Sequence, residues 1–245
     1  MSAYTAATGA EERATQVREH LDALRGRLDQ ACRAVGRDPS TVTTVVVTKQ
    51  WPAADVVTLL DAGVRDLGEA RADEAAAKRA EIAGHRAAGE VVWHHVGQVQ
   101  SRQARVVATH ADVVHSVDRS KLVRALDRAA DPARPLAALV QVDLDERPDP
   151  GRGGAAPADL GALCDEVAAA DGLRLAGLMC VAPRDVDPAP VFDRLAGLAA
   201  RVRTAHPGAV WLSAGMSGDL EAAVAAGATH VRVGTAVLGH RPHPA

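Results

Sequence analysis

The chain of 245 residues contains 47% apolar and 24% charged residues and carries a formal net charge of -3. It has no run of the ~18 consecutive apolar residues that a membrane-spanning helix needs, and residues 1–4 do not begin a signal peptide. The negative charge and the aromatic content of 2% are unlike a nucleic-acid-binding surface, which needs basic side chains and rings for base stacking. Composition therefore excludes a membrane protein and a nucleic-acid-binding protein.

Cysteine and histidine spacing indicates neither disulfides nor a metal site. Cys32, Cys164 and Cys180 are odd in number and far apart, which is typical of buried thiols in a reducing cytoplasm. The close histidine groups, at 94–95 and 240–243, have no carboxylate at helical ligand spacing. We therefore expect a cytoplasmic protein that holds no metal ion.

The chain begins with about nine residues, 1–9, that are expected to be disordered. An amphipathic helix is predicted over 11–35 and ends near Gly36. Its apolar residues recur at steps of three and four, at Val17, Leu21, Leu24, Leu28 and Cys32.

Beyond Gly36, short apolar runs alternate with helical segments. Strands are predicted at 43–48, 65–68, 92–96, 112–116, 139–143, 173–179, 210–213 and 230–233. Helical stretches between them include 53–62, 70–87, 119–129, 158–169, 191–206 and 218–226. This alternation predicts a parallel sheet, because each parallel connection needs a crossover.

Eight such repeats predict an α/β fold, a single (β/α)8 TIM barrel with an extra N-terminal helix. An open doubly wound sheet is the alternative, but its first strand is usually followed by a Gly-rich turn. Here that strand ends in residues 49–52, Lys-Gln-Trp-Pro. The Pro- and Gly-rich segment 146–154 is interpreted as a mobile loop over the barrel mouth rather than as a linker. Residues 1–245 are accordingly expected to form one domain.

Lys49 is the first candidate for chemistry, because the loops that follow barrel strands build the active site. Lysines are rarely buried, and partial burial at a strand end would lower the pKa of this amine and make it a nucleophile for carbonyl compounds. The alternative is a lysine that simply reaches solvent.

A phosphate site is predicted after the seventh and eighth strands, in segments 212–219 and 231–236. Both combine glycine, a hydroxyl and a helix N-terminus with free N–H groups. Alternatively, Ser217 and Thr235 cap their own helices. Together with Lys49, the two turns favour either a phosphorylated sugar or keto acid or pyridoxal 5'-phosphate. Arg232 should project near a pyridine nitrogen or form a salt bridge to a carboxylate such as that of Glu69.

Several segments resemble the pyridoxal-phosphate homeostasis proteins, which are single-domain relatives of the N-terminal barrel of alanine racemase. The likeness runs from the first helix to Arg241. The matching stretches are 47–49, 63–69, 93–100, 116–119, 177–179, 212–219 and 231–235. The order and spacing of these stretches make the resemblance to this family highly specific.

The resemblance implies a role for each matching residue. Lys49 corresponds to the lysine that carries the cofactor as an internal aldimine, and Arg232 to the arginine facing the pyridine nitrogen. Such an arginine keeps that nitrogen unprotonated, which weakens the ring as an electron sink. Ser217, Gly234 and Thr235 correspond to the phosphate cradle, with Met216 beside it. His94 and Ser213 are further candidates for the cofactor pocket.

The chain also departs from the family pattern. Ala70 stands where the family usually has Asn, His95 replaces an aromatic residue, and Arg102-Gln103 replaces an Asn-Lys pair. Arg152-Gly153-Gly154 lies where a Lys-x-Gly turn is common. These changes indicate a divergent member and affect ligand exchange more than cofactor attachment.

The resemblance implies a monomer that holds pyridoxal phosphate and delivers it to apo enzymes, without robust catalysis. Alanine racemase uses a tyrosine from a second domain, whereas Tyr4 is the only tyrosine here. A cofactor-dependent racemase, with His94, His95 or Cys180 in place of that tyrosine, is the second hypothesis. A barrel aldolase or lyase that uses Lys49 without the cofactor is the third.

Overall fold

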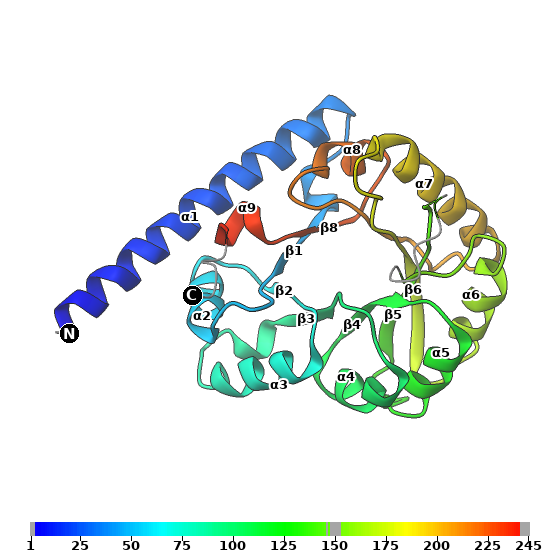
Figure 1. The fold of residues 1–245 in the computed structure, drawn as a ribbon, viewed down its shortest axis with the longest axis horizontal. Coiled ribbons are helices and arrows are strands. Elements are labelled where there is room, and N and C mark those ends of the chain that lie inside the picture. Colours follow the sequence, from blue (N-terminus) through cyan, green and yellow to red (C-terminus); the bar gives the residue numbers. More distant parts are fainter. Residues whose placement is uncertain (1–2, 146, 148–152, 241–245) are drawn as a thin grey trace.

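The fold is a closed barrel of eight parallel strands, seen end-on in Figure 1. This computed structural model describes residues 3–145, 147 and 153–240. The strands pair in sequence order, and the last pairs with the first, from Thr43 opposite His230 to Val46 opposite Val233. They are β1 (Thr43–Val47), β2 (Asp66–Glu69), β3 (Val92–His95), β4 (Val113–Val117), β5 (Leu136–Gln141), β6 (Leu173–Met179), β7 (Trp211–Ser213) and β8 (His230–Val233). The predicted barrel is confirmed.

Helices surround the barrel, as the alternating sequence predicts (Figure 1). They are α2 (Ala53–Asp61), α3 (Ala72–Glu81), α4 (Ala104–His110), α5 (Ser120–Asp127), α6 (Leu160–Ala168), α7 (Pro188–Ala205), α8 (Leu220–Ala225) and α9 (Thr235–Leu238). Short 3-10 turns lie at Pro39–Thr41, Ala88–Glu90 and Ser101–Gln103. No helix in the described part of the chain is long and apolar enough to cross a membrane.

Two element boundaries differ from the prediction in an instructive way. β5 starts at Leu136 rather than at 139, because Ala137 and Ala138 pair with β6 although alanine has a low strand propensity. The predicted helix at 70–87 is reduced to α3, and its chain continues through Gly84 into a 3-10 turn. In the loop predicted over the barrel mouth, residues 146 and 148–152 lie outside the described residues.

The first helix, α1 (Ala3–Ala34), starts eight positions before the predicted 11–35. Alanine-rich sequence at its start has a high helix propensity, which accounts for the earlier beginning. Gly36 has φ +66° and ends the helix, as predicted. The first part of α1 extends past the barrel, whereas its later turns lie along α8 and α9 (Figure 1).

Polar contacts fix α1 to the elements that follow β7 and β8. Arg13 Nη2 donates to Leu238 O at 3.1 Å, and His20 Nδ1 lies 2.8 Å from Val237 O. Arg27 Nη2 donates to Ser217 O at 3.2 Å. The extra helix thus supports the two loops that the sequence predicts to bind phosphate.

Alternation along each strand divides its side chains between the helix layer and the barrel interior. Residues such as Val46, Leu67 and Trp93 pack in the large core between strands and helices. A smaller apolar cluster inside the barrel consists of Val113, Ala137, Leu139, Ala176 and Met179. Buried polar side chains also occupy the interior, and they lead to the candidate site.

Candidate functional site

The carboxyl ends of β1 and β8 bring Lys49 and Gly234 to the same rim of the barrel. Val46 pairs with Val233, so each of these residues follows its strand within a few positions. A Cβ atom on Gly234 would lie 3.3 Å from the carbonyl oxygen of Val47. Glycine therefore allows the backbone after β8 to approach the end of β1 closely, as the predicted site requires.

Lys49 is exposed rather than partly buried, because β1 ends at Val47 and the side chain stands on the rim. The sequence-based expectation of partial burial was wrong, and the side chain reaches solvent. Its amine forms no hydrogen bond or ion pair with any residue that the structure describes. An amine with this freedom can turn toward a ligand in the barrel mouth.

Ser217 joins the two loops that were predicted to form a phosphate cradle. Its Oγ accepts a hydrogen bond at 3.2 Å from the backbone N–H of Ala236, in the first turn of α9. The N-cap of α8 is Asp219, whose carboxylate accepts from Met216 N at 2.5 Å. The alternative that Ser217 caps its own helix is therefore wrong. Thr235 begins α9 with an exposed side chain, and Met216 is also exposed on this rim.

Arg232 lies inside the barrel, with only 6% of its surface exposed. Its Nη1 donates to Ser213 Oγ at 2.6 Å, and its Nη2 donates to Cys180 O at 2.9 Å. The alternative salt bridge to Glu69 is not formed, because the Glu69 carboxylate faces α3 on the outer side of the sheet. Burial lowers the pKa of the Arg232 guanidinium from its usual value.

A chain of hydrogen bonds runs from Arg232 through the barrel interior. Ser213 Oγ lies 2.9 Å from His115 Nδ1, and His115 Nε2 lies 2.9 Å from His94 Nδ1. The other ring nitrogen of His94 is 3.0 Å from Asp66 Oδ1. Arg232 donates to Ser213 Oγ, and at the other end the Asp66 carboxylate only accepts, so His94 donates to it through Nε2. With its Nδ1 as the acceptor, His94 takes the hydrogen bond from His115 Nε2, and His115 Nδ1 accepts from the Ser213 hydroxyl. His115 and His94 thus each donate through Nε2, and the chain ends on the Asp66 carboxylate.

This direction requires a neutral His115. Burial, together with the nearby His94 and Arg232, holds the pKa of His115 well below its usual value. His94 and Ser213, which were predicted to line the cofactor pocket, are 2% and 0% exposed and belong to this chain. They hold Arg232 in place from within the barrel. Sequence reasoning missed His115 and Asp66, although both lie at inward-facing positions of their strands.

His95 faces away from His94, as neighbours on a strand should, and packs near α3 and α4. Burial lowers its pKa to about 4. Its Nε2 has no hydrogen-bond partner among the described residues. Both rings are buried, and neither forms a hydrogen bond with Lys49.

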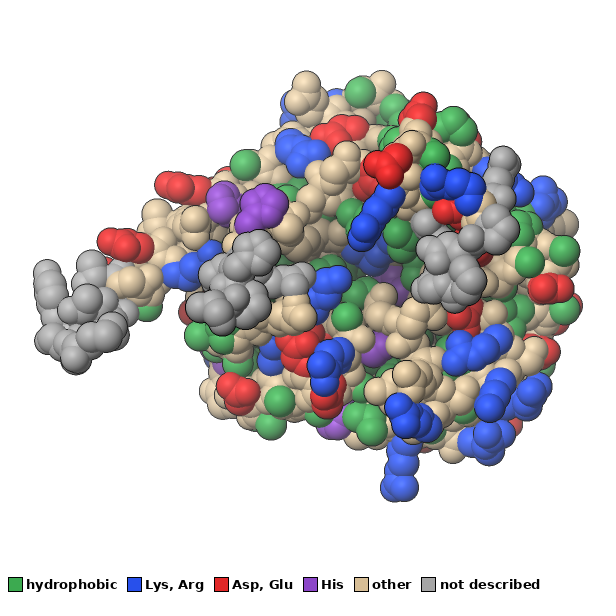
Figure 2. All heavy atoms as spheres, in the orientation of Figure 1, with side chains coloured by type: hydrophobic (Ala, Val, Ile, Leu, Met, Phe, Trp, Pro, Cys, Tyr) green, Lys and Arg blue, Asp and Glu red, His purple; other side chains and the backbone are tan. Residues whose placement is uncertain are grey.

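The residues on this rim fit a small ligand that carries an aldehyde and a phosphate. The donor set comprises a free lysine amine, a close glycine approach at Gly234, a hydroxyl at Ser217 and backbone N–H groups at the start of α9. Figure 2, which looks along the barrel, shows Lys, Arg and His side chains around the centre of the molecule. The chemistry of the site therefore agrees with the cofactor that the sequence suggests.

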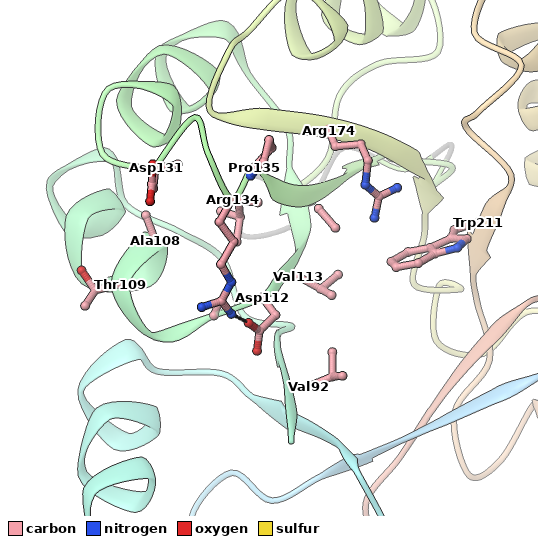
Figure 3. Close-up of a pocket in the computed structure, with 14 residues that line it drawn as sticks. Val92, Ala108, Thr109, Asp112, Val113, Asp131, Arg134, Pro135, Arg174 and Trp211 are labelled. Atoms are coloured by element: carbon pink, nitrogen blue, oxygen red, sulfur yellow. Dashed lines mark hydrogen bonds and ion pairs between the residues drawn. The ribbon is translucent and has the colours of Figure 1, made fainter. Parts of the chain in front are cut away.

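A separate cavity of about 390 Å³ lies at the opposite end of the barrel (Figure 3). It is bordered by the first residues of several strands, including Val92, Val113 and Trp211. Figure 3 shows Arg174 directed at the Trp211 ring, 5.1 Å from its centroid. None of the eight predicted site residues lines this cavity, so it is distinct from the candidate site.

Residues 20–242 match the family model of the alanine racemase N-terminal domain. The chain belongs to this family. A pyridoxal phosphate homeostasis protein of Mycobacterium tuberculosis is 44% identical, over 94% of this chain and 95% of that protein. The Escherichia coli protein of the same name is 33% identical, over 93% of this chain and 97% of that protein.

Among solved structures, PipY from Synechococcus elongatus with pyridoxal phosphate bound has a TM-score of 0.79 and is 34% identical. The match covers 91% of this chain and 100% of that one. The resemblance to pyridoxal-phosphate homeostasis proteins is thus confirmed over nearly the full length of the chain.

Proposed function

We propose that this chain binds pyridoxal 5'-phosphate covalently through Lys49 and maintains the supply of the cofactor without robust catalysis. The main observation behind this proposal is that the free amine of Lys49 lies on the same rim as the cradle formed by Gly234, Ser217 and Ala236. The names of the relatives and the cofactor in PipY support this assignment.

Each candidate residue has a chemical task in the proposed site. Lys49 forms the covalent bond, and Ser217, Gly234 and Thr235 bind the phosphate, with Met216 beside them. Arg232 presents N–H donors to the pyridine nitrogen, and His94 and Ser213 fix its orientation through the internal chain. When bound, the cofactor supplies an electrophilic carbonyl carbon and an electron-withdrawing ring.

The arrangement favours holding the cofactor over two-sided proton transfer. Racemisation needs an acid or base on each face of the substrate carbon. Tyr4, the only tyrosine, lies in the first helix. His94 and His95 are at most 4% exposed, and neither forms a hydrogen bond with Lys49. We accordingly propose a homeostasis role in which residues 1–245 act as one domain and one monomer, with cofactor-free enzymes as recipients. The buried thiols of Cys32, Cys164 and Cys180 support a place in the cytoplasm.

Visible absorption with and without borohydride tests the proposal most directly. The protein incubated with pyridoxal phosphate should turn yellow, and reduction followed by peptide mapping should find the label on Lys49. Lys49→Ala should abolish the covalent label, whereas Lys121→Ala, at an exposed lysine of α5, should retain it. A colourless, unlabelled wild-type protein would overturn the proposed cofactor binding. Optical rotation with L- and D-alanine tests catalysis, since robust racemisation contradicts a purely holding role.

A further inference from the structure

A second lysine, Lys78 of α3, lies directly behind the turn that carries Lys49. Its side chain is almost completely buried, and its Nζ donates three hydrogen bonds. These reach Thr48 O at 2.7 Å, Glu69 Oε1 at 2.7 Å and Glu74 Oε1 at 2.8 Å. An ammonium group has three N–H donors, so every donor of Lys78 is used. This lysine therefore has no free amine to offer a ligand, in contrast to Lys49.

The same two carboxylates bond the residues on both sides of Lys49. Glu69 Oε1 accepts from Thr48 Oγ1 at 2.5 Å, immediately before Lys49. Glu74 Oε1 accepts from the backbone N–H of Gln50, immediately after it. Gln50 has φ +64°, in the left-handed region that residues other than glycine rarely adopt. The carboxylate of Glu74 thus holds a backbone conformation that is intrinsically unfavourable.

We propose that Lys78, together with Glu69 and Glu74, positions Lys49 for reaction with the cofactor. This inference rests on the proposed attachment of pyridoxal phosphate to Lys49. Lys78 bonds the Thr48 carbonyl and both carboxylates, which in turn bond Thr48 and Gln50, so the residues on both sides of Lys49 are tied to β2 and α3. Prior placement of the backbone leaves only the flexible side chain of Lys49 to be ordered during reaction, which raises the rate of attachment.

The ammonium group of Lys78 compensates the buried negative charge of Glu69, so its replacement destabilises the fold. Glu69 is buried and uses only Oε1 for hydrogen bonds, because its Oε2 has no partner among the described residues. Burial raises the pKa of Glu69, and the hydrogen bonds from Lys78 and Thr48 oppose that effect. Removing the ammonium would leave this carboxylate nearly uncompensated inside the protein, which is strongly unfavourable. Glu74 is only partly buried and gives a milder way to disturb the same turn.

Two variants test the proposal, and both are compared with Lys121→Met, at an exposed lysine away from the turn. In Lys78→Met and in Glu74→Ala we expect the rate of covalent attachment, followed by absorbance and borohydride capture, to fall about tenfold. Non-covalent retention of pyridoxal phosphate, measured with each variant combined with Lys49→Ala, should match that of Lys49→Ala alone. Hydrogen exchange of the Gln50 amide in the cofactor-free protein should accelerate in both variants. Glu74→Gln, which keeps an acceptor for this amide, should recover most of the attachment rate.

The outcomes separate the two proposals. If wild-type protein captures the cofactor on Lys49 and folded Lys78→Met and Glu74→Ala do so at the wild-type rate, the positioning role is wrong. If attachment and non-covalent retention fall together, the network is only structural and the proposal is also overturned. If Lys78→Met does not fold, the rate measured for Glu74→Ala decides alone. Failure of the wild-type protein to capture cofactor instead overturns the proposed function.

Discussion

The hydroxyl of Ser217 accepts a hydrogen bond at 3.2 Å from the backbone N–H of Ala236, which lies 19 residues further along the chain. This contact joins the loop after β7 to the first turn of the helix after β8. Both groups therefore face one small region of the rim. A phosphate bound there can accept from the Ser217 hydroxyl and from the backbone N–H of Thr235, since the N–H groups of the next three residues already bond Ser217 and Gly234.

Ser217→Ala should weaken the binding of pyridoxal phosphate by about 1.5–3 kcal/mol, because a hydrogen bond to a charged phosphate is lost. Titration monitored by the visible band measures this change as a Kd increase of roughly 10- to 150-fold. Thr204→Ala is the matched control, since its hydroxyl only bonds the Ala200 carbonyl on the exposed side of α7. An unchanged Kd for Ser217→Ala would remove this hydroxyl from the cradle.

The sequence predicts the barrel and the place of its site because both depend on local patterns. Lys49 and Gly234 directly follow apolar strands, and the carboxyl ends of all strands in a closed parallel barrel meet at one rim. The glycine and hydroxyl residues of the predicted phosphate site can be recognised in the sequence for the same reason. Their position follows from chain order alone once the strands are recognised.

Contacts between distant segments could not be read in this way. The partner of Ser217 depends on how two loops approach, and local capping rules suggested its own helix instead. The exposure of Lys49 depends on where β1 ends relative to the rim. Lys78 gives no signal of its own, since a lysine four residues after Glu74 is a common surface pair on a helix. Only the docking of α3 against the turn at Thr48 buries it.

Arg232→Glu should shift the visible band of the loaded protein, because a carboxylate favours a protonated pyridine nitrogen. The substitution also breaks the hydrogen bonds to Ser213 Oγ and Cys180 O, so we expect a lower Tm. Absorption spectra and thermal unfolding measure the two effects. Arg174→Glu, at the opposite end of the barrel, should leave the band unchanged. If Arg232→Glu prevents folding, Arg232→Gln provides the spectrum, and a band identical to wild type in a folded variant contradicts the assigned position.

Arg27→Ala tests whether the first helix supports the phosphate cradle. Arg27 bonds both the Ser217 carbonyl and the Glu221 carboxylate, which fixes the loop after β7 from outside. We expect a several-fold weaker affinity for pyridoxal phosphate with less than about 1 kcal/mol lost from the free energy of unfolding, because the ion pair is exposed. Arg33→Ala is the control, since Arg33 pairs with Asp29 within the same helix. Equal affinities of the two variants would show that α1 does not influence the cradle.

Stability should fall as the pH decreases from about 7 to 5, because buried histidines are held neutral. Burial, together with the nearby His94, lowers the pKa of His230 to about 4, and burial lowers that of His95 to about 4. In the unfolded chain these two rings take up protons near the ordinary histidine pKa of about 6.5, whereas in the folded protein they remain neutral until about pH 4. Protonation therefore favours unfolding throughout this window. Each of these two histidines should lower the free energy of unfolding by about 2 kcal/mol as the pH falls from 7 to 5.

His230→Gln isolates one of these contributions, since glutamine does not titrate and can still bond the Thr229 hydroxyl, which lies 2.8 Å from His230 Nδ1. Urea unfolding at pH 7 and at pH 5 should show that the variant loses about 2 kcal/mol less than wild type over this interval. His240→Gln, at an exposed histidine, should follow the wild-type pH dependence. Glu69 acts in the opposite direction, because its pKa is raised, and the difference between variants cancels its contribution. Equal losses for wild type and His230→Gln would mean that this ring is already protonated in the folded protein at pH 5.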